Sequence, residues 1–367
     1  MIKYDDILSI DKIMDVYRNI YSNTRHKEKL VRFELAFSCN VVSVLKQLED
    51  RTYSHSNYSV FLINVPKYRI IMSENMKDKI VNHLISKYIL IPTLSPKLID
   101  MNVATRKGMG NKMGVYYTKK YINKLKMNYD NFYVLKCDIS KYFYNIDHEV
   151  LLDKLSKDIE DKEILNILTN IISSTDNENI NKSIDNIIAK EIEKLESKDI
   201  SDLEKKKVEL SRLPRYKAGV GLPIGNETSQ ILAVYYLSGL DHFIKENLRI
   251  KCYIRYMDDF ILFHHDKEYL KFCLKEIEKY LEGVKLKLNR KTQIYDMRRG
   301  FNFLGYKFFL KGKKLIVLIN NQTKKRIKRK LRCLKKKNSP RYALVRASYK
   351  GYFMKAHSGN FIYRAKI

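Results

Sequence analysis

The sequence has no tryptophan and is poor in three other residue types: 5 cysteines, 6 prolines and 13 glycines among 367 residues. The cysteines have no CxxC spacing, which argues against a zinc site and against a disulfide framework. We expect them to be small buried side chains in a reducing compartment. They are Cys39, Cys137, Cys252, Cys273 and Cys333.

No apolar run approaches the length that spans a bilayer, and the first residues, Met1 to Lys12, carry acids rather than a signal-peptide pattern. We therefore expect a cytoplasmic protein with no membrane partner. Hydrophobic residues make up 45% of the chain and charged residues 31%, so the protein is globular rather than disordered. Its length allows two or three subdomains.

Acidic residues are absent after Asp296, whereas residues 297–367 contain 22 Lys and Arg. The net charge is +30, but richness in Lys, Ile and Asn is also typical of AT-biased coding, so the distribution is the stronger evidence. A basic end of this kind favours a polyanion such as a phosphate backbone. A membrane surface is the weaker alternative, because this segment carries rings suited to stacking: Tyr306, Tyr342, Tyr349 and Tyr352.

Periodicity predicts the order of helices and strands. The region before Tyr117 reads as helical, with apolar positions at Ile80, Leu84, Ile85 and Tyr88. A charged segment over 176–211 reads as an inserted helical hairpin on the surface, with a solvated charged face as the simplest role and partner docking as the alternative. Helices are expected over 154–173, 231–248 and 324–337, and strands over 132–137, 251–256, 260–264, 302–309 and 315–319.

Three acids form the candidate catalytic centre. Asp258 and Asp259 stand between two strand-like runs, where an Asp pair is more often a structural turn than a metal site. Asp138 ends a strand and alone would read as a helix N-cap. Together they match a two-metal nucleotidyl-transfer site, which needs oxygen ligands for two Mg²⁺, with Mn²⁺ as an alternative.

The motif Tyr256-Met257-Asp258-Asp259 resembles the catalytic motif of reverse transcriptases. Five further segments resemble the motifs of that family in the expected order, and together they extend from about residue 30 to the C-terminus. They are the basic finger motif (66–70 and 77–79), the first palm motif (136–143), the nucleotide-cradling loop (221–230), the motif after the catalytic hairpin (286–292) and the primer grip (300–306).

The loop motif is similar to that of reverse transcriptases from diversity-generating retroelements, because Ile224-Gly225 and Ser229-Gln230 replace the Gln-Gly and Ser-Pro of most relatives. That resemblance implies low fidelity, a dedicated structured RNA and a small accessory protein. The insertion over 176–211 departs from the pattern. It is either local variation or the mark of a stand-alone antiphage defence enzyme.

The resemblance implies a role for each site residue. Asp138, Asp258, Asp259 and the Ile139 carbonyl would bind metal, and Lys291 would act as general acid. Phe143 would be the steric gate that selects deoxynucleotides. Phe143 reads equally well as a core residue and Lys291 as a surface lysine, and the alternative for Ile224 is a packing residue. The nucleotide set is Lys67, Arg69, Phe143, Ile224 and Gly225; the nucleic-acid set is Arg106, Lys107, Gln230, Tyr256, Lys324, Lys325, Lys328 and Arg332.

The resemblance implies an α+β right hand. Residues 1–117 would form the N-terminal region and fingers, 118–312 a palm with an antiparallel sheet backed by helices, and 313–367 a basic thumb. The expected function is RNA-directed DNA synthesis, with template RNA, the RNA–DNA duplex and dNTPs as partners. The alternatives are an RNA-directed RNA polymerase and a non-catalytic RNA-binding scaffold. The sequence leaves the oligomeric state open.

Overall fold

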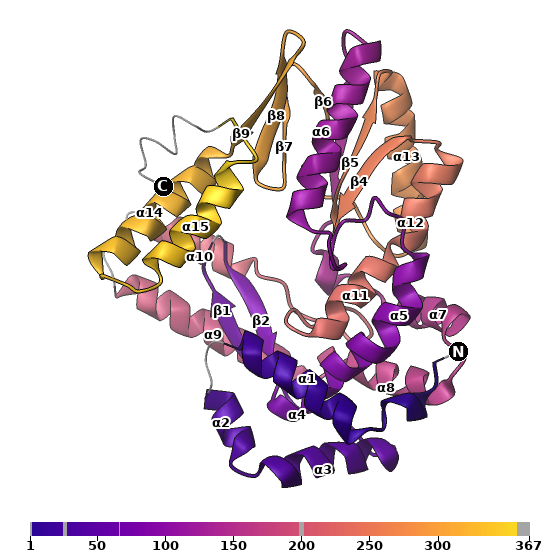
Figure 1. Cartoon of the computed structure of the whole chain (residues 1–367), viewed down its shortest axis with the longest axis vertical. Helices are drawn as coiled ribbons and strands as arrows, with labels where there is room; N and C mark the ends of the chain where they lie inside the picture. The colour runs from indigo at the N-terminus through magenta and orange to yellow at the C-terminus, as the bar shows by residue number, and fades with distance from the viewer. Residues whose placement is uncertain (1, 25–27, 66, 198–201, 358–367) are drawn as a thin grey trace. The chain divides into compact units, whose positions relative to one another are not determined.

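The computed structural model describes residues 2–24, 28–65, 67–197 and 202–357 and has an α+β architecture with antiparallel sheets, as expected (Figure 1). The chain divides into two compact units, each described by itself below. Unit 1 comprises Met1–Ile99, Ser140–Gly239 and Leu281–Lys287. Unit 2 comprises Asp100–Ile139, Leu240–Tyr280 and Leu288–Ile367.

Unit 1 is mainly helical. Its helices are α1 (Ile10–Asn23), α2 (Glu28–Glu34), α3 (Phe37–Glu49), α4 (Met76–Ile85), α5 (Ile91–Leu94), α7 (His148–Asp158), α8 (Lys162–Ile172), α9 (Glu178–Glu196), α10 (Leu203–Ser211) and α11 (Glu227–Tyr236). The one helix expected over 154–173 is wrong. The Asp161 carboxylate accepts hydrogen bonds from the backbone of Glu163 and Ile164, and so starts α8 as a separate helix.

A strand hairpin interrupts the region that was expected to be helical. Strands β1 (Ser59–Ile63) and β2 (Arg69–Ser73) pair in antiparallel register, with Val60 opposite Met72. The run Val60-Phe61-Leu62-Ile63 is aromatic, branched and apolar, a composition that fits a pleated surface better than a helix.

The helical hairpin expected over 176–211 is confirmed in its described part; residues 198–201 lie outside the described residues. Its apolar stripe packs against the strand hairpin. Ile180, Ile184 and Ile188 of α9 are buried in one cluster with Ile70 and Met72 of β2. The insertion therefore has a solvated face and also supplies the core beneath β1 and β2.

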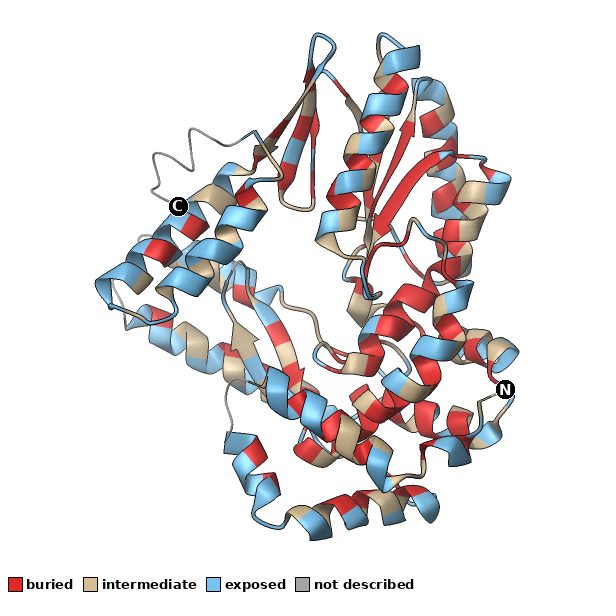
Figure 2. Cartoon of the chain, viewed as in Figure 1, coloured by how far each residue is buried: buried red, intermediate tan, exposed pale blue. Residues whose placement is uncertain are grey.

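Unit 2 contains a four-stranded antiparallel sheet in the order β4-β5-β3-β6. The strands are β3 (Tyr133–Asp138), β4 (Cys252–Tyr256), β5 (Asp259–His264) and β6 (Gln293–Asp296). Residues of β3 and β5 such as Val134 and Phe263 bury one face against Ile122 of α6 (Asn111–Asn128). Helix α12 (Ser238–His242) precedes β4, and α13 (Lys267–Gly283) follows β5. Figure 2 shows β4 and β5 buried along most of their length.

A second sheet in unit 2 contains β7 (Phe301–Phe303), β8 (Tyr306–Lys311) and β9 (Lys314–Ile319). The single strand expected over 302–309 is wrong, because Leu304 and Gly305 both have positive φ (50° and 86°) and form a two-residue hairpin turn. Helices α14 (Asn321–Lys336) and α15 (Tyr342–Phe353) follow. Residues 358–367 of the expected thumb lie outside the described residues.

The cysteines only partly follow expectation: Cys137, Cys252 and Cys273 are buried, but Cys39 and Cys333 are exposed. Within the described ranges, every helix is either too short or too polar to cross a membrane.

Candidate functional site

The acids meet at one end of the four-stranded sheet, within unit 2. Asp138, the last residue of β3, lies directly opposite Asp259, the first residue of β5. Tyr256 pairs with Asp259 across β4 and β5, so Met257 and Asp258 form the two-residue turn of the hairpin. Met257 has φ of 58°, a conformation that is strained for a non-glycine residue. Backbone strain of this kind is often found at functional sites.

Lys136 is a neighbour of these acids that the sequence analysis missed. It lies two residues before Asp138, hence on the same face of β3, and its Nζ is 3.3 Å from Asp259 Oδ2. The pKa of Asp259 is raised to about 7, mainly by burial; Lys136 opposes the rise, and the nearby carboxylates of Asp138 and Asp258 add to it. The sequence did contain a signal for this neighbour, because residues two apart in a strand, such as Lys136 and Asp138, lie on the same face.

Asn289 connects Asp138 to the segment that contains Lys291. The Asn289 side-chain amide donates to Asp138 Oδ2 at 3.0 Å, and its backbone N–H donates to the Asp138 carbonyl at 2.7 Å. The Asn289 side-chain oxygen accepts from the Lys291 backbone N–H at 3.2 Å, and the Lys291 side chain is exposed. Ile139 is buried and forms an isolated bridge with Leu288. Asn289 thus holds the Lys291 backbone close to Asp138. Ile139 directly follows Asp138 in the chain and pairs with the residue before Asn289.

A buried ion pair between β4 and α12 supports the acidic turn. Arg255 of β4 and Asp241 of α12 both have fully buried side chains, with Nη2–Oδ2 and Nε–Oδ1 distances of 2.5 and 2.7 Å. The Tyr253 hydroxyl donates to Asp241 at 2.6 Å. Arg255 Nη1 also donates to the carbonyl of Met257 at 2.9 Å, and so fixes the strained residue of the turn. An arginine inside a buried strand was the sequence signal for such a pair.

The donor atoms of the acidic centre suit a hard divalent cation, because such ions prefer carboxylate oxygens. Asp259 Oδ1 is buried and forms no hydrogen bond within the described chain, and a cation beside it would reverse the rise in its pKa. However, among the described residues no group of three or more His, Cys, Asp or Glu is arranged to hold a metal ion. The assignment of two ions to Asp138, Ile139, Asp258 and Asp259 stays a prediction.

Unit 1 brings most of the predicted nucleotide set together through backbone hydrogen bonds. The Leu222 N–H donates to the Phe143 carbonyl at 2.7 Å, and the Met72 N–H donates to the Ile224 carbonyl at 2.9 Å. Gly225 packs against the same strand, since a Cβ built there would lie 2.0 Å from the Met72 carbonyl oxygen. Phe143 and Ile224 are half-buried and so still offer part of their side chains to a ligand.

The remaining predicted contacts in unit 1 are exposed. Lys67 lies in the turn between β1 and β2, and Arg69 begins β2, the strand that bonds to Ile224. Gln230 is an exposed residue of α11. All three side chains are therefore accessible to phosphates or a template strand.

The predicted nucleic-acid residues of unit 2 differ in accessibility. Lys107 is exposed, but the Arg106 side chain is 14% exposed and its guanidinium lies 3.9 Å from Asp100. Tyr256 is half-buried against the core of the unit. On α14, Ile327 and Leu331 are buried, Lys324 is half-buried, and the remaining predicted side chains are exposed: Lys325, Lys328 and Arg332.

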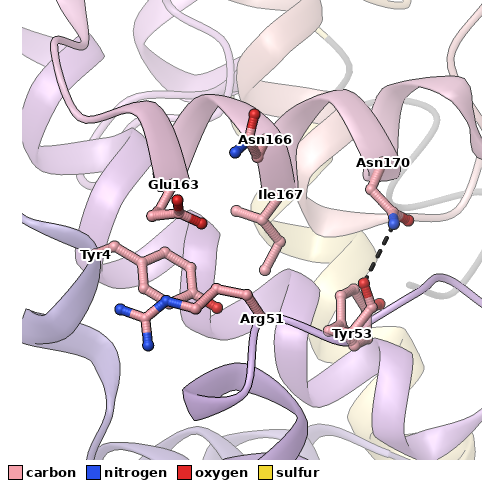
Figure 3. Close-up of a pocket in the computed structure, with 7 residues that line it drawn as sticks. All are labelled: Tyr4, Arg51, Tyr53, Glu163, Asn166, Ile167 and Asn170. Carbon is pink, nitrogen blue, oxygen red and sulfur yellow. Dashed lines mark hydrogen bonds between the residues drawn. The ribbon is translucent and has the colours of Figure 1, made fainter.

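A small cavity of about 130 Å³ in unit 1 has a structural role (Figure 3). Asn170, one of its lining residues, donates to the Tyr53 carbonyl at 3.2 Å and accepts from the His55 N–H at 3.0 Å. Arg51 pairs with Asp5 at 2.9 Å. These polar atoms fasten the segment before β1 to α8. The other lining residues are Tyr4, Glu163, Asn166 and Ile167.

The comparison with family models agrees with the motifs. The family model described as "Reverse transcriptase (RNA-dependent DNA polymerase)" matches residues 63–308. Among solved structures, telomerase from Candida albicans in complex with the TWJ fragment of telomeric RNA is similar, with 13% identity and a TM-score of 0.48. That match covers 79% of this chain and 52% of the telomerase chain, so this chain spans about half its length. No match was found among curated proteins.

Proposed function

This chain belongs to the reverse transcriptase family, and we propose that it makes DNA on an RNA template by attack of a primer 3′-hydroxyl on a dNTP. The observation that carries the proposal is the register that sets Asp138 directly opposite Asp259, with Asp258 in the adjoining turn. Two Mg²⁺ ions bound there would stabilise the charge on the attacking and leaving oxygens.

The surrounding residues of unit 2 position and balance these acids. Arg255 holds the turn through the Met257 carbonyl, and Asn289 orients the Asp138 carboxylate. Lys136 offsets negative charge at Asp259. Lys291, whose backbone is fixed by Asn289, serves as the proton donor to the leaving pyrophosphate.

Primer extension on an RNA template with Mg²⁺ tests this function. Asp258→Asn keeps the size of the side chain but removes its charge, and we expect no detectable extension. Asp266→Asn is the matched control, because Asp266 is an exposed residue just beyond β5, and it should extend like the wild type. Full activity of Asp258→Asn, or its loss in both variants, would overturn the assignment.

We assign sugar selection to Phe143, whose ring would exclude a ribose 2′-hydroxyl. Phe143→Val removes the ring but keeps the backbone carbonyl that bonds to Leu222, so the loop stays attached. We expect ribonucleotide incorporation to rise in this variant. Unchanged rejection of NTPs would refute the role. Preference of the wild type for NTPs would instead favour an RNA-directed RNA polymerase.

We assign low fidelity to Ile224, since an apolar side chain cannot hydrogen-bond to the sugar or the template. Ile224→Gln keeps the carbonyl that accepts from Met72, so the comparison isolates the side chain. We expect fewer misincorporations, above all opposite template adenine. Equal error spectra would contradict the assignment and, with it, the diversity-generating subtype.

The biological setting that we propose is a cytoplasmic diversity-generating retroelement with a structured RNA and a small accessory protein. The support is the Ile224-Gly225 and Ser229-Gln230 pattern. A stand-alone antiphage enzyme is the alternative, favoured by the insertion that forms α9 and α10. Sequencing the RNA that copurifies, and its cDNA, separates the two. We retain fingers, palm and thumb over 1–117, 118–312 and 313–367 as part of this proposal.

A further inference from the structure

A basic cavity lies at the end of the four-stranded sheet away from the acidic turn. Its volume is about 760 Å³, within the roughly 300–1,000 Å³ of ligand pockets. Tyr133 of β3 contributes to its lining, and Lys267 Nζ lies 6.0 Å from the centre of that ring. Among its described lining residues Asp296 is the one acid, and Arg298 pairs with it at 2.6 Å. Lys267 and Arg299 therefore give the cavity a positive charge.

A row of aromatic rings continues from this cavity. Tyr133 lies directly opposite His264 of β5, which places the two side chains on the same face of the sheet at neighbouring positions. From His264 the ring contacts continue in two directions, with centroid separations of 4.3 to 5.9 Å; the two contacts of His264 itself are tilted. The members of this ring row are Tyr129, His264, His265, Tyr269 and Phe272.

The ring row is open to solvent. Phe272 is 50% exposed and Tyr129 is 38% exposed, and Tyr129 lies parallel to His265, with an angle of 1° between the rings. Two acids beside the row already have partners, whereas Asp130, next to Tyr129, is exposed. Asp266 accepts the backbone N–H groups of Glu268 and Tyr269, and Glu268 pairs with Lys271 at 2.8 Å. Flat exposed rings beside unneutralised cations match unpaired bases and phosphates.

This surface is separate from the acidic centre. His264 comes five residues after Asp259 on β5, which corresponds to about 17 Å along the strand. Tyr133 and Asp138 stand at opposite ends of β3 in the same way. Their side chains also point to opposite faces of the sheet, because five positions separate them. A nucleic acid bound here would not contact the acids through the same nucleotides.

We propose that this end of the sheet binds single-stranded RNA, with phosphates on Lys267 and Arg299 and bases stacked on the ring row. The inference rests on the proposed function, because the bound RNA would be an unpaired part of the template or of its flanking sequence. The cavity and the ring row would hold that RNA while the paired part occupies the acidic centre.

Equilibrium binding tests the site without catalysis. The probes are a blunt RNA–DNA hybrid and the same hybrid with a long single-stranded RNA extension. In the wild type we expect tighter binding of the extended probe. In Lys267→Gln/Arg299→Gln that advantage should disappear. For the extended probe, the slope of log K against log salt concentration should become shallower by about 1.4, because each of the two lost phosphate contacts contributes about 0.7. Binding of the blunt hybrid should not change.

Two further variants separate stacking from charge. Phe272→Ala removes an exposed ring and should weaken binding of the extended probe by roughly fivefold or more. Lys275→Gln is the matched control, an exposed lysine farther along α13, and should bind like the wild type. Inorganic polyphosphate should compete poorly with RNA.

Several outcomes would overturn the site: no advantage of the extended probe in the wild type, wild-type binding in the double variant, an equal loss for the blunt hybrid, or equal competition by polyphosphate. Failure of the proposed function looks different. If the wild type extends no primer, yet the double variant still loses binding of the extended probe, the RNA site stands and the polymerase assignment falls.

Discussion

Replacing Arg255 with methionine should damage both stability and catalysis, by separable routes. Arg255 and Asp241 are fully buried, with 2.5 and 2.7 Å contacts between the guanidinium and the carboxylate. Arg255→Met leaves the Asp241 carboxylate buried, with a hydrogen bond from the Tyr253 hydroxyl but no cation to balance its charge. Removing one member of a buried pair costs about 3–5 kcal/mol. That is a large part of the roughly 5–15 kcal/mol that holds a domain folded.

The catalytic loss comes from a different bond of the same side chain. Arg255 Nη1 holds the Met257 carbonyl at 2.9 Å, and Met257 is the strained residue beside Asp258. A hydrogen bond from a charged group contributes about 1.5–3 kcal/mol. If the turn moves when it is lost, extension should slow by roughly tenfold to a hundredfold, since about 1.4 kcal/mol is tenfold in rate.

The double variant Arg255→Met/Asp241→Leu separates these routes. Replacing the whole buried pair by apolar side chains is often neutral or stabilising, so urea unfolding should show recovery toward the wild type. Extension should remain slow, because the bond to Met257 is still missing. Lys251→Met, an exposed lysine just before β4, is the control and should change neither property.

Two results would refute this reasoning. If the double variant is as unstable as Arg255→Met, the uncompensated carboxylate of Asp241 is not the cause of the instability. If the double variant extends primers like the wild type, Arg255 does not hold the turn in its active form.

Three further variants test other parts of the chain. Gly225→Ala would place a Cβ 2.0 Å from the Met72 oxygen at φ of 150°, so KM for dNTPs should rise steeply in primer extension, whereas Gly283→Ala, with open space, should be silent. Ile184→Ala removes a fully buried side chain beneath β2 and should lower stability by about 2–5 kcal/mol in urea unfolding. Burial lowers the pKa of His83 from 6.5 to about 4, so the unfolded chain takes up a proton before the folded one does. Stability should fall as the pH drops from 6.5 toward 4, and His83→Gln should remove part of that fall in acid titrations.

The sheet that carries the acids could be predicted from sequence because its signals are local. Aromatic and branched runs mark β3, β4 and β5, and the acids at their ends show where the strands stop. The Asp138–Asp259 pairing follows from antiparallel register. The two-residue turn at Leu304 and Gly305 was missed because the apolar pattern continues through it, although the glycine was a signal.

The supporting contacts could not be predicted in the same way. Asp241 and Arg255 meet across two elements, and nothing in the periodicity of either one identifies its partner. Asn289 reaches Asp138 from a segment 151 residues later in the chain. The break between α7 and α8 depends on capping by Asp161, a signal that the continuous apolar stripe obscured. Pairings of this kind are fixed by the folded backbone rather than by local composition.

The packing of α9 beneath β1 and β2 has a consequence for how the sequence can evolve and be engineered. The strand hairpin carries Arg69 and bonds to Ile224, and its apolar underside fits the isoleucines of a segment encoded much later in the gene. The two segments must therefore vary together. A chimera that exchanges the charged insertion alone would pack β2 against side chains that do not fit it. A chimera that exchanges both segments would keep the packing between α9 and β2.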